Sequence, residues 1–202
     1  MNREERVYRN QDLVADDRVP AGTAEVLNHI MESVYSLARQ PPELSQVTST
    51  VEPSDAGLTI AQLVHGLHEN NTVQWNWEDE VRRRDVSAAH TTHCKRTIDA
   101  LNLRRHAFIE AIDDALTSRV DQDLEAEPHT ETVGMIVDRL SVLELRRHQL
   151  SRSAETHQTS SALDRVALQI CHLREGLGRL LTRCATGERR IVTYRADKLY
   201  GR

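Results

Sequence analysis

The feature that most constrains the fold is the spacing of apolar residues near the end of the chain. Between residues 161 and 186, apolar side chains recur at alternating steps of three and four residues. They are Leu163, Val166, Ile170, Leu173, Leu177, Leu180 and Cys184. Such steps place side chains on one face of an α-helix, which is typical of a helix in a bundle. We therefore expect a long amphipathic helix that begins at Ser161 and ends before Gly187.

Similar helical spacing appears in four earlier segments. Thr23 is placed to cap the first helix, which should stop before Pro41, and Thr59 with Gln62 has the spacing of a capping box. We expect helices from residue 23 to about 40, from 59 to about 85, from 87 to 119 and from 130 to 153. Aromatic residues make up only 3% of the chain, which favours helices over a sheet-based core. The expected fold is all-α: an up-and-down bundle of four long helices plus a shorter N-terminal helix.

A chain of 202 residues is long enough for one well-packed core. We expect a flexible N-terminal arm over residues 1–22, the helical bundle over 23–186 and a basic tail over 187–202. The three cysteines, Cys94, Cys171 and Cys184, lack a C-x-x-C spacing and are expected to be buried, inert thiols. No apolar run approaches the ~20 residues of a membrane helix, so a cytoplasmic protein with no membrane partner is expected.

The charge is unevenly distributed along the chain. The formal net charge is −5, although the segment from Arg179 to the end carries seven basic and two acidic residues. A protein that binds nucleic acid usually has a basic domain, so we expect no nucleic-acid partner. Two interpretations of the basic tail stay open: it binds an anionic partner, or it is a solvated end that complements the C-terminus of the preceding helix. A homo-oligomer formed through the helical surface is a further expectation.

The most informative stretch lies in the second helix, at residues 65–85. Polar side chains there fall within an arc of about 100° on one helical face. They are His68, Asn71, Trp75, Glu78, Asp79 and Arg82. Upstream, Ile60, Leu63 and Leu67 occupy nearly the same face, so an apolar stripe becomes polar without a change of register. Polar groups on a core-facing stripe cost stability unless they bind one another or a ligand.

The next helix also directs polar groups toward the core. Arg105 lies near the middle of its apolar face, and Asn102 and Asp113 lie at the edge. In the following helix, Asp138 and Ser141 are expected to lie off the inner stripe.

Two interpretations of these polar residues stay open. In the first, they form a site with Glu78 or Asp79 as acid or base. Its ligand-binding residues would be His68, Asn71, Trp75, Arg82, Asn102, Arg105 and Asp113. In the second, they form a structural network in which Arg82 and Arg105 pair with Glu78, Asp79 or Asp113 across the bundle.

A metal centre is not expected. Di-iron bundles use Glu-x-x-His pairs on two helices, and this chain has none. No glycine-rich phosphate loop is present either, and we expect no cofactor. Trp77 lies two residues from Trp75, about 200° around the helix, and should point away from the polar arc.

Four blocks of residues, in order over most of residues 58–202, resemble the bacterial family known as domain of unknown function 4254 (DUF4254). The first has His68, Asn71, Trp75, Glu78-Asp79 and Arg82; the second has Ile98-Asp99, Leu101-Asn102, Arg105, Ile109-Glu110 and Ile112-Asp113; the third has Gly134 and Val137 through Leu143; the fourth has Gly187, Arg189-Arg190, Tyr194-Arg195, Lys198 and Tyr200. The resemblance implies a helical domain, sometimes encoded near glycosyltransferases or other sugar and secondary-metabolite genes, and no established activity. Relatives tend to have Arg-Asn-Asp where this chain has Arg105-His106-Ala107, and Trp77 is a second departure.

Two functional hypotheses follow. The first is a pocket that binds a small anionic ligand such as a sugar phosphate or nucleotide sugar, in glycan or secondary-metabolite biosynthesis. The second is a non-enzymatic interaction or scaffold protein whose polar stripe is a structural ion-pair network. Catalysis by Glu78 or Asp79 is a third option, for which the residues name no substrate.

Overall fold

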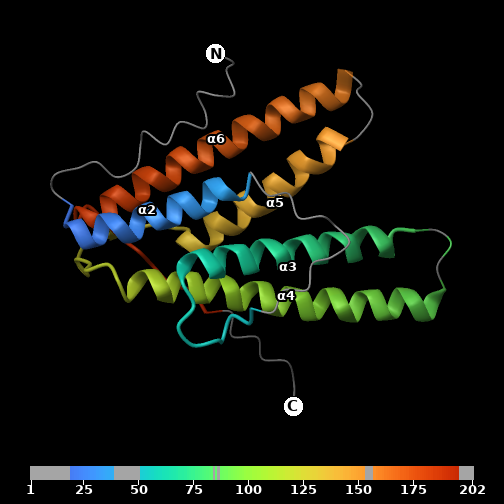
Figure 1. Cartoon of the computed structure of the whole chain (residues 1–202), viewed down its shortest axis with the longest axis horizontal. Helices are drawn as coiled ribbons and strands as arrows, with labels where there is room; N and C mark the ends of the chain where they lie inside the picture. Colours follow the sequence, from blue (N-terminus) through green and yellow to red (C-terminus); the bar gives the residue numbers. More distant parts are fainter. Residues whose placement is uncertain (1–18, 39–50, 84, 86, 153–156, 196–202) are drawn as a thin grey trace.

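The computed structural model describes residues 19–38, 51–83, 85, 87–152 and 157–195, coloured by sequence in Figure 1. Within these residues the elements are α2 (Ala21–Ser36), α3 (Ile60–Val81), α4 (Ala88–Thr117), β1 (Glu127–Pro128), α5 (Val133–Arg152), α6 (His157–Ala185) and β2 (Arg189–Arg190). Most of the predicted N-terminal arm and the end of the basic tail, with Lys198 and Tyr200, lie outside the described residues.

The helices form two antiparallel pairs. α3 and α4 lie side by side, α5 and α6 form a second pair inclined to the first, and α2 contacts α3, α5 and α6 (Figure 1). The prediction of an all-α bundle with four long helices and a shorter N-terminal one is confirmed. No helix within the described residues combines the length and apolar character needed to cross a membrane.

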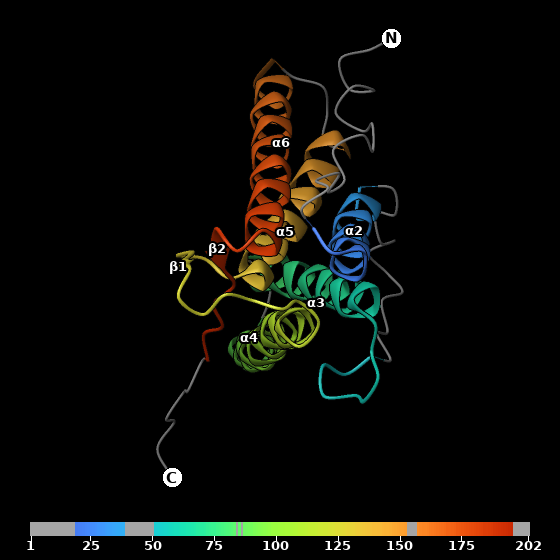
Figure 2. The same ribbon diagram turned by 90° about the vertical axis from the view of Figure 1, so that its left-hand side faces the viewer.

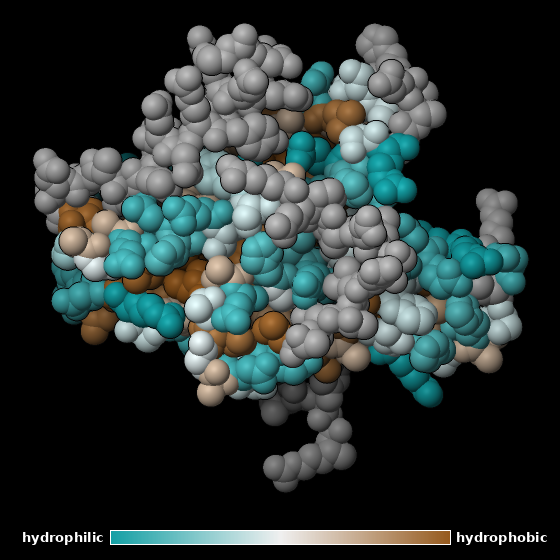
Figure 3. Space-filling model, viewed as in Figure 1, coloured by the Kyte–Doolittle hydropathy of each residue, from teal (hydrophilic) through white to brown (hydrophobic). Residues whose placement is uncertain are grey.

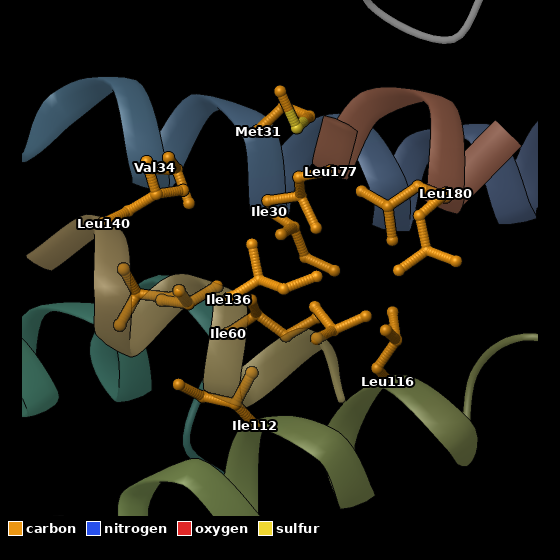
Figure 4. Close-up of a cluster of buried hydrophobic side chains, with 14 of the residues drawn as sticks. Ile30, Met31, Val34, Ile60, Ile112, Leu116, Ile136, Leu140, Leu177 and Leu180 are labelled. Atoms are coloured by element: carbon orange, nitrogen blue, oxygen red, sulfur yellow. The ribbon is translucent and has the colours of Figure 1, made fainter. Parts of the chain in front are cut away.

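The hydrophobic core lies where the helices meet. Ile30 and Val34 of α2, Ile136 of α5 and Leu177 of α6 converge in Figure 4. Burial of such aliphatic side chains is worth about 1.5–3 kcal/mol each before the loss of chain entropy is subtracted. On the surface view, hydrophobic residues lie in small patches separated by hydrophilic ones (Figure 3).

α4 and α5 approach each other unusually closely. A Cβ atom on Gly134 of α5 would collide with the carbonyl oxygen of Ile109 in α4, so only glycine fits this crossing. Gly66 of α3 packs closely against the ring of Phe108 in α4, because a Cβ atom at residue 66 would lie only 2.7 Å from ring carbons. These contacts bring the backbones of three helices together around the polar residues described below.

Two predicted helix starts are wrong by a few residues. α2 begins at Ala21, because Pro20 occupies the N-cap position and its carbonyl accepts the Ala24 N–H at 2.9 Å; Thr23 therefore lies inside the first turn. α5 begins at Val133 and not at Thr130. Its cap is Thr132, whose hydroxyl accepts the Met135 N–H at 3.1 Å.

Two other predicted boundaries also differ. α3 keeps the predicted capping box of Thr59 but ends at Val81, because the Arg83 N–H turns to the Glu80 carbonyl in a 3₁₀-type bond. α6 begins at His157, four residues before the expected start. The hydroxyl of Ser161 accepts a hydrogen bond from the Arg165 guanidinium at 2.5 Å instead of capping the helix.

The described part of the basic tail folds back onto the bundle. β2 pairs in parallel with β1, Ile191 is buried, and Arg195 binds Asp114 of α4 at 2.7 Å. Figure 2 shows the chain beyond β2 passing beside α4. The sequence did not predict this two-residue strand pairing, because strands this short carry no recognisable pattern.

Candidate functional site

A chain of hydrogen bonds connects five polar residues between α3, α4 and α5. Arg105 donates from Nε to Oδ1 of Asp138 at 2.7 Å and from Nη2 to Oδ2. The Asn71 amide donates to Asp138 Oδ1 and to the Ser141 hydroxyl, both at 3.0 Å. His68 Nδ1 lies 2.9 Å from the same hydroxyl. We call these five residues the polar network.

Asp138 and Ser141 are central to the polar network, although the sequence places them off the apolar stripe of α5. Their exposed fractions are 5% and 0%. α5 is covered by α3 and α4 on one side and by α6 on the other, so more than one of its faces is buried. The tight crossing at Gly134 helps to bring Asp138 within reach of α4.

His68 is neutral in the polar network. Burial lowers its pKa to about 4, with a smaller contribution from His65. The Ser141 hydroxyl already accepts the Asn71 amide, so its own proton is available for His68 Nδ1. This arrangement favours the tautomer that carries its proton on Nε2.

Arg105 is the member of the polar network that reaches solvent. Its side chain is 28% exposed, whereas that of Asp138 is 7% exposed. The hydrogen bonds to Asp138 raise the pKa of Arg105, and burial opposes this shift. Nε and Nη2 are held by the carboxylate, which leaves Nη1 as the group that can meet a ligand.

Near the middle of the predicted polar face, Gln74, Glu78 and Asn102 form a second, smaller group of hydrogen-bonded residues. The Gln74 amide donates to Glu78 Oε1 and to Asn102 Oδ1, each at 3.0 Å. Asn102 therefore contacts α3, as expected, through Gln74, a buried residue that the sequence analysis did not select.

The C-terminal end of the same face is exposed. Arg82 and Asp79 pair at 2.9 Å, with 65% and 58% of their side chains exposed, and Arg82 also approaches Glu78 at 3.5 Å. The predicted structural network is therefore observed only in part, because Arg82 binds Glu78 and Asp79 within its own helix, while the Glu78 carboxylate helps to raise the pKa of Arg105 in α4. Arg82 pairs within α3, and Arg105 pairs with Asp138 because α5 covers that part of the crossing. The catalytic role of Glu78 and Asp79 stays a prediction.

Asp113 lies in a different place from the polar network. Its Oδ1 accepts the backbone N–H of Gly134 at 2.7 Å, so this α4 carboxylate binds the N-terminus of α5. Desolvation raises the pKa of Asp113 to about 6, although the bonds from Gly134 and Thr132 act in the opposite direction. This contact gives the buried carboxylate a structural partner, and its role in ligand binding stays a prediction.

The two tryptophans are both half-buried. Trp77 packs edge-on against the ring of His93 in α4, with centroids 5.5 Å apart. Trp75 shares the helical face of Asn71 and stays a predicted ligand contact.

A second buried charge cluster, which the sequence analysis missed, joins α5 to α6. Glu144 accepts hydrogen bonds from Arg174 at 2.7 Å and from Arg147 at 2.8 Å, and the Arg174 guanidinium lies over the ring of Tyr35. A small cavity of about 170 Å³ separates this cluster from His68. The signal available in the sequence was weak, because an isolated glutamate on a helix usually faces solvent.

Two hollows adjoin the exposed side of Arg105. The tail hollow, of about 470 Å³, lies between α4, α5 and the tail, and its polar lining includes Arg105, His106, Glu131, Arg139, Tyr194 and Arg195. The α5–α6 hollow, of about 440 Å³, is lined by Arg105, Arg139, Val142, Leu143, His172 and Leu173, with Gln169. Arg105 and Arg139 belong to both hollows, and together the two form what we call the Arg105 groove.

Metal-binding chemistry has no visible basis in the described residues. Nowhere among them do three His, Cys, Asp or Glu side chains come together in a way that could hold an ion.

All three cysteines are free thiols. Burial raises the pKa of Cys184 to about 11, which keeps that thiol protonated. Cys171 is partly exposed, contrary to the expectation of burial, and lies 3.4 Å from Glu175.

Comparison with known proteins agrees with the resemblance noted from the sequence. The model of one family, described as "Protein of unknown function (DUF4254)", matches residues 61–193, which include the polar network and Asp113. The searches of curated proteins and of solved structures found no match. Because the family model covers well over half of the chain, this protein belongs to the DUF4254 family.

Proposed function

We propose that the protein binds a small anionic ligand, of the sugar-phosphate or nucleotide-sugar type, in the Arg105 groove. The observation that carries the proposal is the position of Arg105. Its guanidinium is held on one side by buried Asp138 and meets the groove with the other. A guanidinium fixed in this way loses little conformational freedom when it binds a phosphate or carboxylate.

Two further cations in the groove support the same ligand chemistry. Arg139 pairs with Glu131 at 2.7 Å, and Arg195 pairs with Glu110 and Asp114. Both guanidiniums are about half exposed. Exposed pairs of this kind are worth only about 0–1 kcal/mol, so an anion can replace their carboxylate partners at small cost. The buried pair of Arg105 with Asp138 would stay intact.

The test is isothermal titration calorimetry with glucose 1-phosphate and UDP-glucose. Arg139→Gln removes a groove cation without touching the polar network, and Arg165→Gln removes another exposed cation, on α6, as the matched control. We expect binding to the unchanged protein, a roughly tenfold loss in Arg139→Gln and no loss in Arg165→Gln. Absence of binding to the unchanged protein, or equal loss in both variants, would contradict the proposal.

A specific observation also favours the second candidate function, a non-enzymatic scaffold protein in which the polar network is purely structural. His68, Asn71, Asp138 and Ser141 are at most 5% exposed and bind one another. Such a network can specify which helices pair and in which register. If the polar network is purely structural, Asn71→Ala should lower the melting temperature. Glucose 1-phosphate and UDP-glucose should then not change the melting temperature of the unchanged protein. A rise in that temperature with either ester would favour ligand binding.

A further inference from the structure

The arrangement of the two hollows indicates the shape of the ligand, if the proposed function holds. Arg105 and Arg139 are shared by both hollows, so the cations stand between two concave surfaces and not at the end of one. We infer that the ligand carries its anionic group in the middle, with a substituent on each side. A phosphodiester or a diphosphate diester has this form, whereas a terminal phosphate has a substituent on one side only.

The sizes of the hollows support two substituents. Their volumes are about 440 and 470 Å³, each within the range of pockets that hold a small molecule. A terminal phosphate bound at the two arginines would place its single substituent in one hollow. The other hollow would stay filled with water, so burial of its apolar side chains would contribute nothing to the binding free energy.

The hollows also differ in chemistry, so the two substituents should differ. The α5–α6 hollow has an apolar wall of Val142, Leu143 and Leu173, which suits a flat ring or an aliphatic group. The tail hollow also has apolar side chains, Ile109 and Met135, but it adds Tyr194, which is 48% exposed, and the charged Arg195 and Glu110. An exposed phenol beside charged groups suits a hydroxylated ring that both stacks and forms hydrogen bonds.

The experiment compares ligands of equal charge. Uridine monophosphate, glucose 1-phosphate and UDP-glucose each carry about two negative charges at pH 8, so differences in affinity report shape and not charge. Calorimetry on the full chain should show UDP-glucose binding at least about tenfold more tightly than either monoester. The comparison is repeated with adenosine monophosphate, ribose 5-phosphate and ADP-ribose, so that it does not depend on one base or sugar.

Two substitutions test the hollows separately. His106 and His172 are exposed helix residues, one in each hollow, so His106→Trp and His172→Trp each fill one hollow without disturbing the core. His29→Trp, at an exposed position of α2, is the matched control. We expect each hollow-filling variant to weaken diester binding about tenfold, and a given monoester to be weakened by one of them at most.

The outcomes separate this inference from the proposed function. If the monoesters bind and neither diester binds more tightly, the two-sided ligand is wrong and anion binding stands. If a diester binds tightly but only one filling variant weakens it, the second substituent lies in solvent and the inference is again wrong. If no phosphate compound binds, the proposed function itself fails.

Discussion

The two ends of the polar face of α3 differ in what covers them. His68 and Asn71 are 4% exposed and bind residues of α5, whereas Asp79 and Arg82 lie three turns further on and are more than half exposed. Both ends keep the same helical register. Only the first end is crossed by α5, as the hydrogen bonds to Asp138 and Ser141 demonstrate. A polar stripe on one helix therefore does not by itself distinguish a buried network from a solvated surface.

The largest expected effect comes from breaking the buried end. Asp138→Ala removes the acceptor of both Arg105 hydrogen bonds and one of the two acceptors of the Asn71 amide. We expect a loss of about 3–5 kcal/mol in the free energy of unfolding, measured by urea denaturation. Asp79→Ala at the exposed end is the control and should change stability by less than about 0.5 kcal/mol. Similar losses in both variants would remove the distinction between the two ends.

A smaller effect is expected from forcing α5 away from α4. A methyl group at Gly134 meets the Ile109 backbone, so Gly134→Ala should destabilise the protein by about 1–3 kcal/mol. Gly176→Ala in α6 is the control, because nothing lies within 4 Å of its added Cβ and alanine suits a helix better. Thermal unfolding should show opposite shifts in melting temperature. A neutral Gly134→Ala would mean that α5 can move without loss of the network.

The smallest net change in stability is expected when the pH is lowered, because two buried groups titrate with opposite effects. Asp113 has a raised pKa of about 6, so its stabilising contribution is complete below its unfolded value near 3.8 and is lost as the pH rises through 6. His68 has a lowered pKa of about 4, so its contribution is complete above 6.5 and is lost as the pH falls toward 4. Between pH 4 and 6 these two contributions oppose each other.

A variant in which Asp113 cannot titrate should show the pH dependence of stability that His68 causes. Asp113→Asn retains an oxygen that can accept the Gly134 N–H but no longer titrates. Urea denaturation of this variant should show a steeper loss of stability from pH 6.5 to 4 than the unchanged protein shows. An identical pH dependence would mean that Asp113 has an ordinary pKa in the folded protein.

The helices could be predicted with good accuracy because their signals are local. The capping box of Thr59 and Gln62 formed as expected, and the apolar period of α6 lies on a buried face. Helix ends were less accurate, because Pro20 and Thr132 compete with nearby residues for the same cap. His68, Asn71 and Arg105 were selected from the sequence and do come together. Arg82 and Asp113, selected by the same argument, lie elsewhere.

By itself, the sequence determined that this protein is a helical bundle and that α3 and α4 direct some polar groups inward. Periodicity settles these points, because the residues involved are three or four positions apart. The tertiary structure alone decided which polar groups meet. Asp138 lies 33 residues from Arg105 and 67 from Asn71, and their contact depends on how closely α5 approaches α4 at Gly134. Packing of separate helices, which no local pattern encodes, set that distance.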